Sequence, residues 1–207
     1  MENSVRGKAL VASPFLGDPN FLRTVVYMLS HDEDMALGLV LNRPTNHTIA
    51  EMVRRLDGQE IENADAVFDG GPVSNNLTLL QSVRSADGSK CVIFLASEPS
   101  KVIEICVDQA NPEEVSELMQ SLCEDTELDK QSLVPEGFRV FEGCASWGPG
   151  QLDRELEEGS WLVWDVGPDD IFGPADTLWD DAVREIGRDI LASGIDPARI
   201  PKDPAFN

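Results

Sequence analysis

Histidine is scarce in this chain, which limits the catalytic sites that it can build. The 207 residues include two histidines, His31 and His47. Any Ser-His-Asp or Cys-His site must use one of them, and both stand in hydrophilic stretches without a Gly-x-Ser-x-Gly motif nearby. His31, Asp32 and Asp34 cluster in one turn, but a metal site needs a second ligand group that the sequence does not supply. We predict no catalytic residue and no metal site. The sequence does not exclude an enzyme, but it favours a protein without catalytic activity.

Glycine-rich phosphate-binding loops are also missing. The sequence contains neither Gly-x-x-x-x-Gly-Lys-Ser/Thr nor a Gly-x-Gly-x-x-Gly motif after an expected strand. We therefore predict no nucleotide cofactor, and no other cofactor is indicated.

Long apolar runs and closely spaced cysteines are lacking as well. No apolar run approaches the roughly 18–20 residues of a membrane span, and the first residues do not resemble an export signal. The four cysteines, at positions 91, 106, 123 and 144, include no Cys-x-x-Cys pair, which favours free thiols in a reducing compartment. We expect a cytoplasmic protein that does not enter the membrane.

Positive charge is low relative to negative charge. The chain has 38 acidic and 16 basic residues, a formal net charge of −22. Most of the affinity for duplex DNA comes from Lys and Arg that neutralise phosphates, so such a chain is repelled by DNA before any base is read. We predict no direct nucleic-acid binding. Three roles of the acidic surface stay open: it keeps the protein in solution, it binds a basic protein partner, or it associates with divalent cations.

The most informative stretch is 138–165, which predicts a strand, a turn, a short helix and a second strand. Phe138–Phe141 favours a strand, the glycines that follow favour a turn, and Pro149 suits a first helical position. Gly159 offers a left-handed end to the helix. Trp161–Trp164 is apolar on both faces, so we expect it deep in the sheet.

The remaining pattern interleaves a hairpin and further strands with unevenly spaced helices. We expect strands 24–30 and 36–42 to form an antiparallel hairpin, and 91–95 to return beside 77–81 after Asp87-Gly88. Thr48 and Glu51 have capping-box spacing, which predicts a helix that stops near residue 57. Other expected elements are strands 7–13 and 66–68, a helical face with Val102, Ile103 and Cys106, and a helix 112–123. A last helix from about residue 176 should bury Leu178, Trp179, Ala182, Val183, Ile186 and Ile190. This order indicates the α+β class.

A longer set of residues resembles a known family. The matching residues are Gly143, Ala145, Trp147, Gly148, Pro149, Gly150, Gln151 and Leu152, followed by 158–162. They are similar to the Gly-Tyr-Ala-Gly-Trp-Gly-Pro-Gly-Gln-Leu…Gly-Ser-Trp-Leu signature of the YqgE/AlgH family (UPF0301, DUF179). Blocks at 10–14, 18–21, 23–27, 38–44 and 70–73 match in the expected order, and the match covers most of 7–190.

The resemblance implies a fold and a broad role. It implies a mixed, partly barrel-like β-sheet surrounded by helices, and members carry a transcriptional-regulator name without an established set of catalytic residues. Cys144 and Ser146 stand where the family usually has Tyr and Gly, and Gln81 where a His is common. Residues 107–136 are longer than the usual link, so we expect an insertion that adds a surface helix. We expect one domain over 1–207 with an irregular tail from about 196.

Two functional hypotheses follow, with self-assembly as a third. The first is a regulator that acts through an unidentified protein partner or ligand rather than through DNA. The second is a small-ligand-binding protein or enzyme with a groove between three turns, whose candidate residues are Asn42, Arg43, Gly70, Gly71, Trp147 and Gln151. Arg43 suits a carboxylate or phosphate ligand, or a pairing with an acidic side chain, which we favour. Trp147 suits either core packing or a pocket wall. The oligomeric state stays open.

Overall fold

The computed structural model describes residues 4–85, 91–108 and 133–194 of the chain. The expected turn at Asp87-Gly88, the helix 112–123, most of the insertion 107–136 and the tail from 196 lie outside the described residues. No helix in the described ranges is both long enough and apolar enough to cross a membrane.

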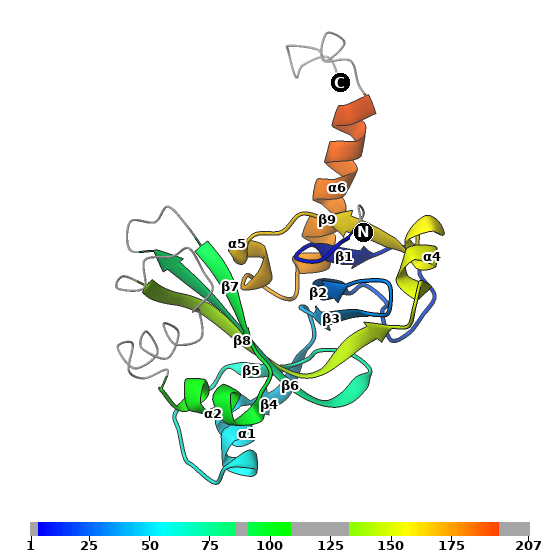
Figure 1. Ribbon diagram of the computed structural model, residues 1–207. Helices are drawn as coiled ribbons and strands as arrows, with labels where there is room; N and C mark the ends of the chain where they lie inside the picture. The colour runs from blue at the N-terminus through cyan, green and yellow to red at the C-terminus, as the bar shows by residue number, and fades with distance from the viewer. Residues whose placement is uncertain (1–3, 86–90, 109–132, 195–207) are drawn as a thin grey trace, which may run out of the picture.

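Nine strands of the described chain form one mixed sheet, and helices lie around it (Figure 1). The main order is β4-β5-β8-β3-β2-β1-β9, with β6 pairing with β8 and β7, and the sheet is not closed into a barrel. β5 and β8 are parallel, and the other pairs are antiparallel. The strands are β1 (Ala9–Ala12), β2 (Val25–His31), β3 (Ala36–Val40), β4 (Pro44–Thr48), β5 (Ala66–Asp69), β6 (Val73–Ser85), β7 (Cys91–Ala96), β8 (Leu133–Trp147) and β9 (Trp161–Trp164). The α+β class with a mixed sheet is confirmed.

The long strand β8 joins the two halves of the sheet. Its first part pairs with β6 and its last part with β3, so one strand contributes to both halves (Figure 1). The sequence predicted a strand that ended before Gly143, and this was wrong. Gly143 stays within β8 at φ 82°, a conformation that glycine adopts readily. The backbone of Gly70 packs directly against it, because a Cβ at Gly70 would lie 2.2 Å from the Gly143 carbonyl oxygen.

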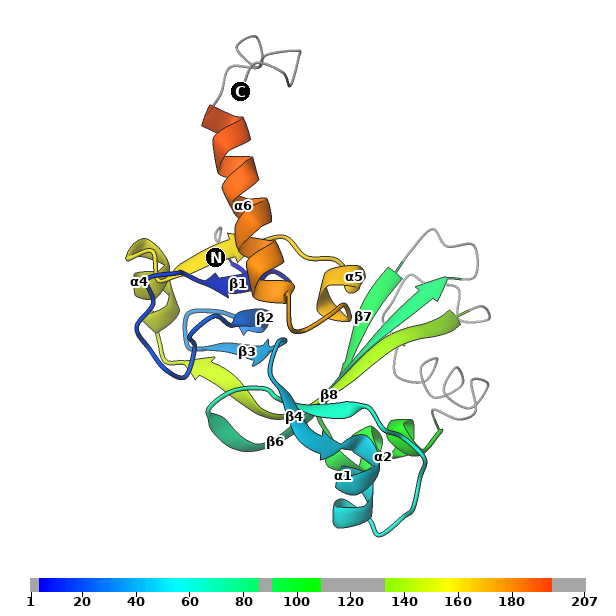
Figure 2. The same cartoon turned by 180° about the vertical axis from the view of Figure 1, so that it is seen from behind.

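The helices cover three apolar clusters. The helices are α1 (Ile49–Leu56), α2 (Pro99–Asp108), α4 (Gln151–Glu157), α5 (Pro168–Ile171) and α6 (Leu178–Gly194). α1 and α2 pack on the part of the sheet formed by β5, β6 and β8. α5 and α6 bury residues against β1, β3 and β8, and α4 packs through Leu152 on the other side of β1 and β2. The two views show α1 and α2 far from α4 (Figures 1 and 2).

Local patterns predicted several elements correctly. The hairpin of β2 and β3 is confirmed, and so is the return of β7 beside β6. Gly159, at φ 74°, lies just beyond α4, and the Ser160 N–H donates to the Glu155 carbonyl at 2.9 Å. α4 begins at Gln151, two residues later than expected, with Gly150 rather than Pro149 at its start.

Other predictions fail where tertiary packing decides. β9 lies at the end of the strand order beside β1, and Val163 is 42 % exposed, so the expected central position is wrong. Strand β4 was not predicted, because it starts with proline and is largely polar. It lies at the end of the strand order opposite β9, and an edge strand tolerates a proline and polar side chains. Ile190 is 61 % exposed rather than buried, because the second half of α6 extends away from the sheet (Figures 1 and 2).

The capping box of α1 gives a first test. The Thr48 hydroxyl accepts from the Glu51 N–H at 3.2 Å, and the Glu51 carboxylate accepts from the Thr48 N–H at 2.9 Å. We expect Thr48→Ala to lower the free energy of unfolding by about 1 kcal/mol in urea titrations, and Thr48→Ser to stay close to the parent protein. Equal losses in both variants would contradict a role for the hydroxyl.

The capping box of Thr48 and Glu51 also makes the stability of the protein depend on pH. The hydrogen bond from the Thr48 backbone lowers the pKa of Glu51. The stability that the Glu51 carboxylate contributes to the folded state is therefore fully present above the ordinary pKa of glutamate. It is lost as the pH falls through the lowered pKa of Glu51.

Candidate functional site

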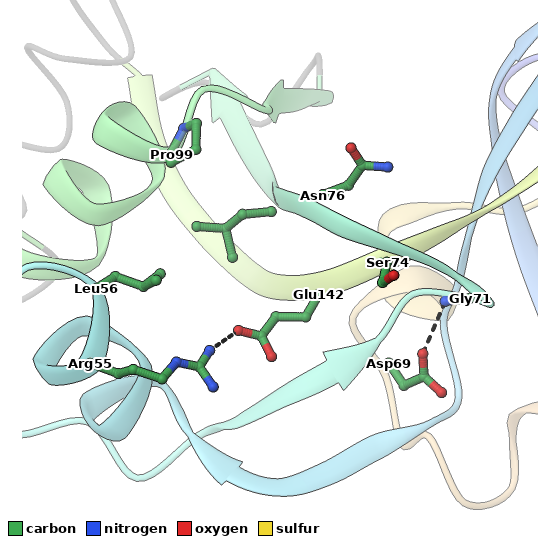
Figure 3. A pocket seen from close by; sticks show the side chains of 10 residues that line it. Arg55, Leu56, Asp69, Gly71, Ser74, Asn76, Pro99 and Glu142 are labelled. Atoms are coloured by element: carbon green, nitrogen blue, oxygen red, sulfur yellow. Dashed lines mark hydrogen bonds and ion pairs between the residues drawn. The ribbon is translucent and has the colours of Figure 1, made fainter.

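A cavity of about 500 Å³ opens where α1, α2 and three strands meet, and we call it the charged cavity (Figure 3). It brings ionic and polar side chains from distant parts of the sequence to one place. The lining residues are Arg55, Leu56, Asp69, Gly71, Ser74, Asn76, Leu77, Pro99, Glu142 and Gly143. Its volume lies within the range typical of small-molecule sites.

Sheet register explains why the acidic side chains converge. Asp69 on β5 and Leu77 on β6 are both direct partners of Glu142 on β8. Directly paired residues project from the same face of a sheet, so these three side chains share one face. Arg55, in the last turn of α1, points toward this face and forms an ion pair with Glu142 (Figure 3). The Asp69 carboxylate accepts a hydrogen bond from the Gly71 N–H at 3.1 Å.

A second cavity, of about 450 Å³, adjoins the first, and we call it the apolar cavity. Its apolar wall comprises Leu29, Leu37, Leu77, Leu95 and Pro99, and its polar lining residues are Ser30, Asn76, Thr78, Ser97 and Cys144. Asn76, Leu77 and Pro99 line both cavities. The Asn76 amide nitrogen donates to the buried Cys144 sulfur at 2.9 Å. Cys144, which stands where the family usually has Tyr, therefore faces this second cavity.

Of the residues predicted for a ligand groove, Gly71 lines the charged cavity. Gly70 is buried against β8 and shapes the corner beside it. The Asn42 side chain accepts from the Val25 N–H at 3.0 Å and donates to the Arg23 carbonyl at 2.9 Å, which holds the end of β3 to β2. The Arg43 guanidinium donates to the Asn20 carbonyl at 2.7 Å, and no acidic side chain of the described residues forms the ion pair with Arg43 that we favoured.

Trp147 and Gln151 belong to a packing cluster elsewhere in the molecule. The indole N–H groups of Trp147 and Trp161 both donate to Glu155 Oε2, at 2.9 and 2.8 Å, and the Gln151 amide donates to Glu155 Oε1 at 2.8 Å. Phe21 stacks on Trp147, and its ring centroid lies 5.4 Å from that of Trp161. Trp147 is thus a core residue at this point.

The structure therefore divides the predicted groove. Trp147 pairs with Ala36 at the start of β3, whereas Arg43 follows the end of the same strand. Arg43 and Trp147 line neither the charged cavity nor the apolar cavity, whereas Gly71 lines the charged cavity.

Sequence reasoning missed most of the residues that line the charged cavity. Glu142 had a usable signal, since it is an acidic residue inside the apolar run of β8. Asp69 had a weaker one, directly before the two glycines. Arg55 had none, because a basic residue in the last turn of a helix is common.

A buried cation lies outside both cavities. Arg139 on β8 is 8 % exposed and donates to the carbonyls of Leu41, at 2.9 Å, and Gly173, while its guanidinium lies 4.5 Å from the centroid of the Phe68 ring. Burial lowers its pKa to about 10, so it stays protonated at neutral pH. Its contacts tie the segment before α6 to the sheet, which is a structural role.

Comparison with known proteins gives one consistent result. The sequence profile described as AlgH-like matches residues 9–191. A UPF0301 protein of Streptomyces avermitilis is 34 % identical over 210 residues, covering 99 % of this chain and 96 % of the relative. A UPF0301 protein of Colwellia psychrerythraea is 30 % identical, covering 91 % and 95 %.

Solved structures agree at the level of the fold. The solution structure of the AlgH protein from Pseudomonas aeruginosa superimposes with a TM-score of 0.60 at 22 % identity, covering 95 % of this chain and 92 % of that one. A crystal structure of a Corynebacterium diphtheriae protein gives 0.57 at 22 % identity, covering 87 % and 86 %.

Proposed function

The chain belongs to the AlgH-like family, and on that premise we propose that it binds a small ligand in the charged cavity and acts through the bound ligand or a protein partner, not through DNA. The observation that carries this proposal is the convergence of Arg55, Asp69 and Glu142 with two polar side chains on one cavity of about 500 Å³. A concave site of this size with a few polar groups is the usual form of a small-molecule site.

The charges of the described residues support the proposal that the protein does not act by binding DNA. Within the described ranges, six basic residues are held in ion pairs with acidic side chains, and the formal net charge of the sequence is −22. These six are Lys8, Arg23, Arg55, Arg84, Lys101 and Arg184. A basic side chain that is paired with a carboxylate neutralises a phosphate less effectively, which weakens the main source of affinity for DNA. We propose that any effect on transcription passes through a partner or ligand, and that the protein works in the cytoplasm.

Ligand binding is tested by thermal unfolding against a panel of metabolites. A ligand present at 100 times its dissociation constant stabilises the native state by about 2.7 kcal/mol, which corresponds to a rise in Tm of roughly 5–10 °C for a chain of this size. We expect at least one compound to produce such a rise, and Arg55→Gln, which leaves Glu142 in the cavity lining without its ion-pair partner, to change the size of the rise.

A matched control separates the cavity from general charge effects. Arg184→Gln removes an arginine that is also paired with a carboxylate, Asp181, but on α6. It should keep the full rise in Tm. A panel in which no compound stabilises the protein, or specific and salt-sensitive binding to duplex DNA, would contradict the proposed function.

A further inference from the structure

The charged cavity and the apolar cavity are two compartments of one groove, since Asn76, Leu77 and Pro99 line both. We infer that the ligand is an amphipathic amine, with an ammonium head in the charged cavity and a hydrocarbon tail in the apolar cavity. This inference rests on the proposed function and specifies its ligand class.

The charge balance of the first compartment favours a cationic head. Its charged lining consists of one arginine and two carboxylates, and Arg55 is already paired with Glu142. Asp69 has no ion-pair partner among the described residues, and its hydrogen bond from Gly71 N–H engages one oxygen and leaves the other available. An ammonium group entering this compartment would therefore compensate a carboxylate, whereas a carboxylate ligand would add to an existing excess of negative charge.

Polar neighbours match the three donors of an ammonium group. The Asn76 amide nitrogen is engaged by Cys144 Sγ, which leaves the amide oxygen to accept. The Ser74 hydroxyl also lines this compartment and lies on the same side as Asp69 in Figure 3. Asp69, Ser74 and Asn76 thus each contribute a side chain with an oxygen acceptor to the lining of this compartment.

The second compartment favours a hydrocarbon tail. Leu29, Leu37, Leu77 and Leu95 line it from four different positions of the sheet. Leu95 is 39 % exposed, so a tail that covers it removes apolar surface from water. A fully polar amine would leave this surface uncovered.

Straight-chain amines of increasing length test the inference by calorimetry. Between butylamine and hexylamine, we expect the dissociation constant to fall about fourfold per methylene, as burial of each CH₂ predicts. Hexanoate, which has a similar tail and the opposite charge, should not bind. Leu95→Asp, and independently Ser97→Trp at an exposed position of the same cavity, should remove the dependence on chain length while circular dichroism stays unchanged.

Two substitutions of equal charge test the head group. Asp69→Asn keeps an oxygen that can accept from the Gly71 N–H and should weaken hexylamine binding at least tenfold. Glu157→Gln removes one negative charge on α4, away from the groove in both overall views, and should leave binding unchanged (Figures 1 and 2). Equal weakening by Asp69→Asn and Glu157→Gln, with the same affinity for all amines, would show only attraction to net charge and would overturn the inference.

The two proposals can fail separately. If a metabolite raises Tm in an Arg55-dependent manner but neither chain length nor the Leu95 and Ser97 variants affect any ligand, the amphipathic amine is wrong and the ligand-binding function stands. If neither the metabolite panel nor the amines stabilise the protein, both are wrong.

Discussion

Replacing Glu155 by alanine is expected to lower the free energy of unfolding by about 3 kcal/mol. This carboxylate accepts from the indole N–H groups of Trp147 and Trp161, and each of these rings is only 3 % exposed. Without the acceptor, two buried donors remain unsatisfied at about 1–3 kcal/mol each. The measurement is urea unfolding followed by tryptophan fluorescence, which also reports on the two rings.

Glu157→Ala provides the matched control for this prediction. It removes a carboxylate from an exposed position of the same helix, α4. We expect its effect to stay within about 0.5 kcal/mol, as for most surface substitutions. If Glu155→Ala and Glu157→Ala have the same small effect, water replaces the carboxylate at the indoles, and the cluster does not depend on Glu155.

Gly70→Ala is expected to lower the free energy of unfolding by about 3 kcal/mol or more. The added Cβ would lie 2.2 Å from the Gly143 carbonyl oxygen and 3.0 Å from its carbonyl carbon, so two backbone segments must move apart. Such overpacking against backbone cannot be relieved by a side-chain rotation. The loss is measured as the change in urea midpoint, or as loss of soluble protein if the variant does not fold.

A control variant and the alternative role of Gly70 can both be tested by experiment. Gly17→Ala places a Cβ in open space without a positive φ, and it should be close to neutral. A ligand-binding role for Gly70, as the sequence suggested, predicts instead a stable protein with altered binding. A Gly70→Ala variant with unchanged Tm would therefore contradict the packing role and favour the binding one.

The sequence by itself determined the family and the elements that depend on near neighbours in the chain. The signature around Trp147 and the blocks before it identified the family, and the order of expected strands and helices and the family resemblance both indicated the α+β fold. The capping box of Thr48 and Glu51, the hairpin of β2 and β3, and the left-handed stop at Gly159 were predictable because each is decided within a few residues.

Only the tertiary structure decided the candidate site and the roles of the residues in the signature. Arg55, Asp69 and Glu142 are separated by up to 87 residues, and strand register and the docking of α1 bring them together. The same is true of Glu155, whose two indole partners come from different strands. Residue types and spacing report on neighbours along the chain, whereas a cavity depends on which distant backbones pair and in what register, and that is determined when the whole sheet assembles.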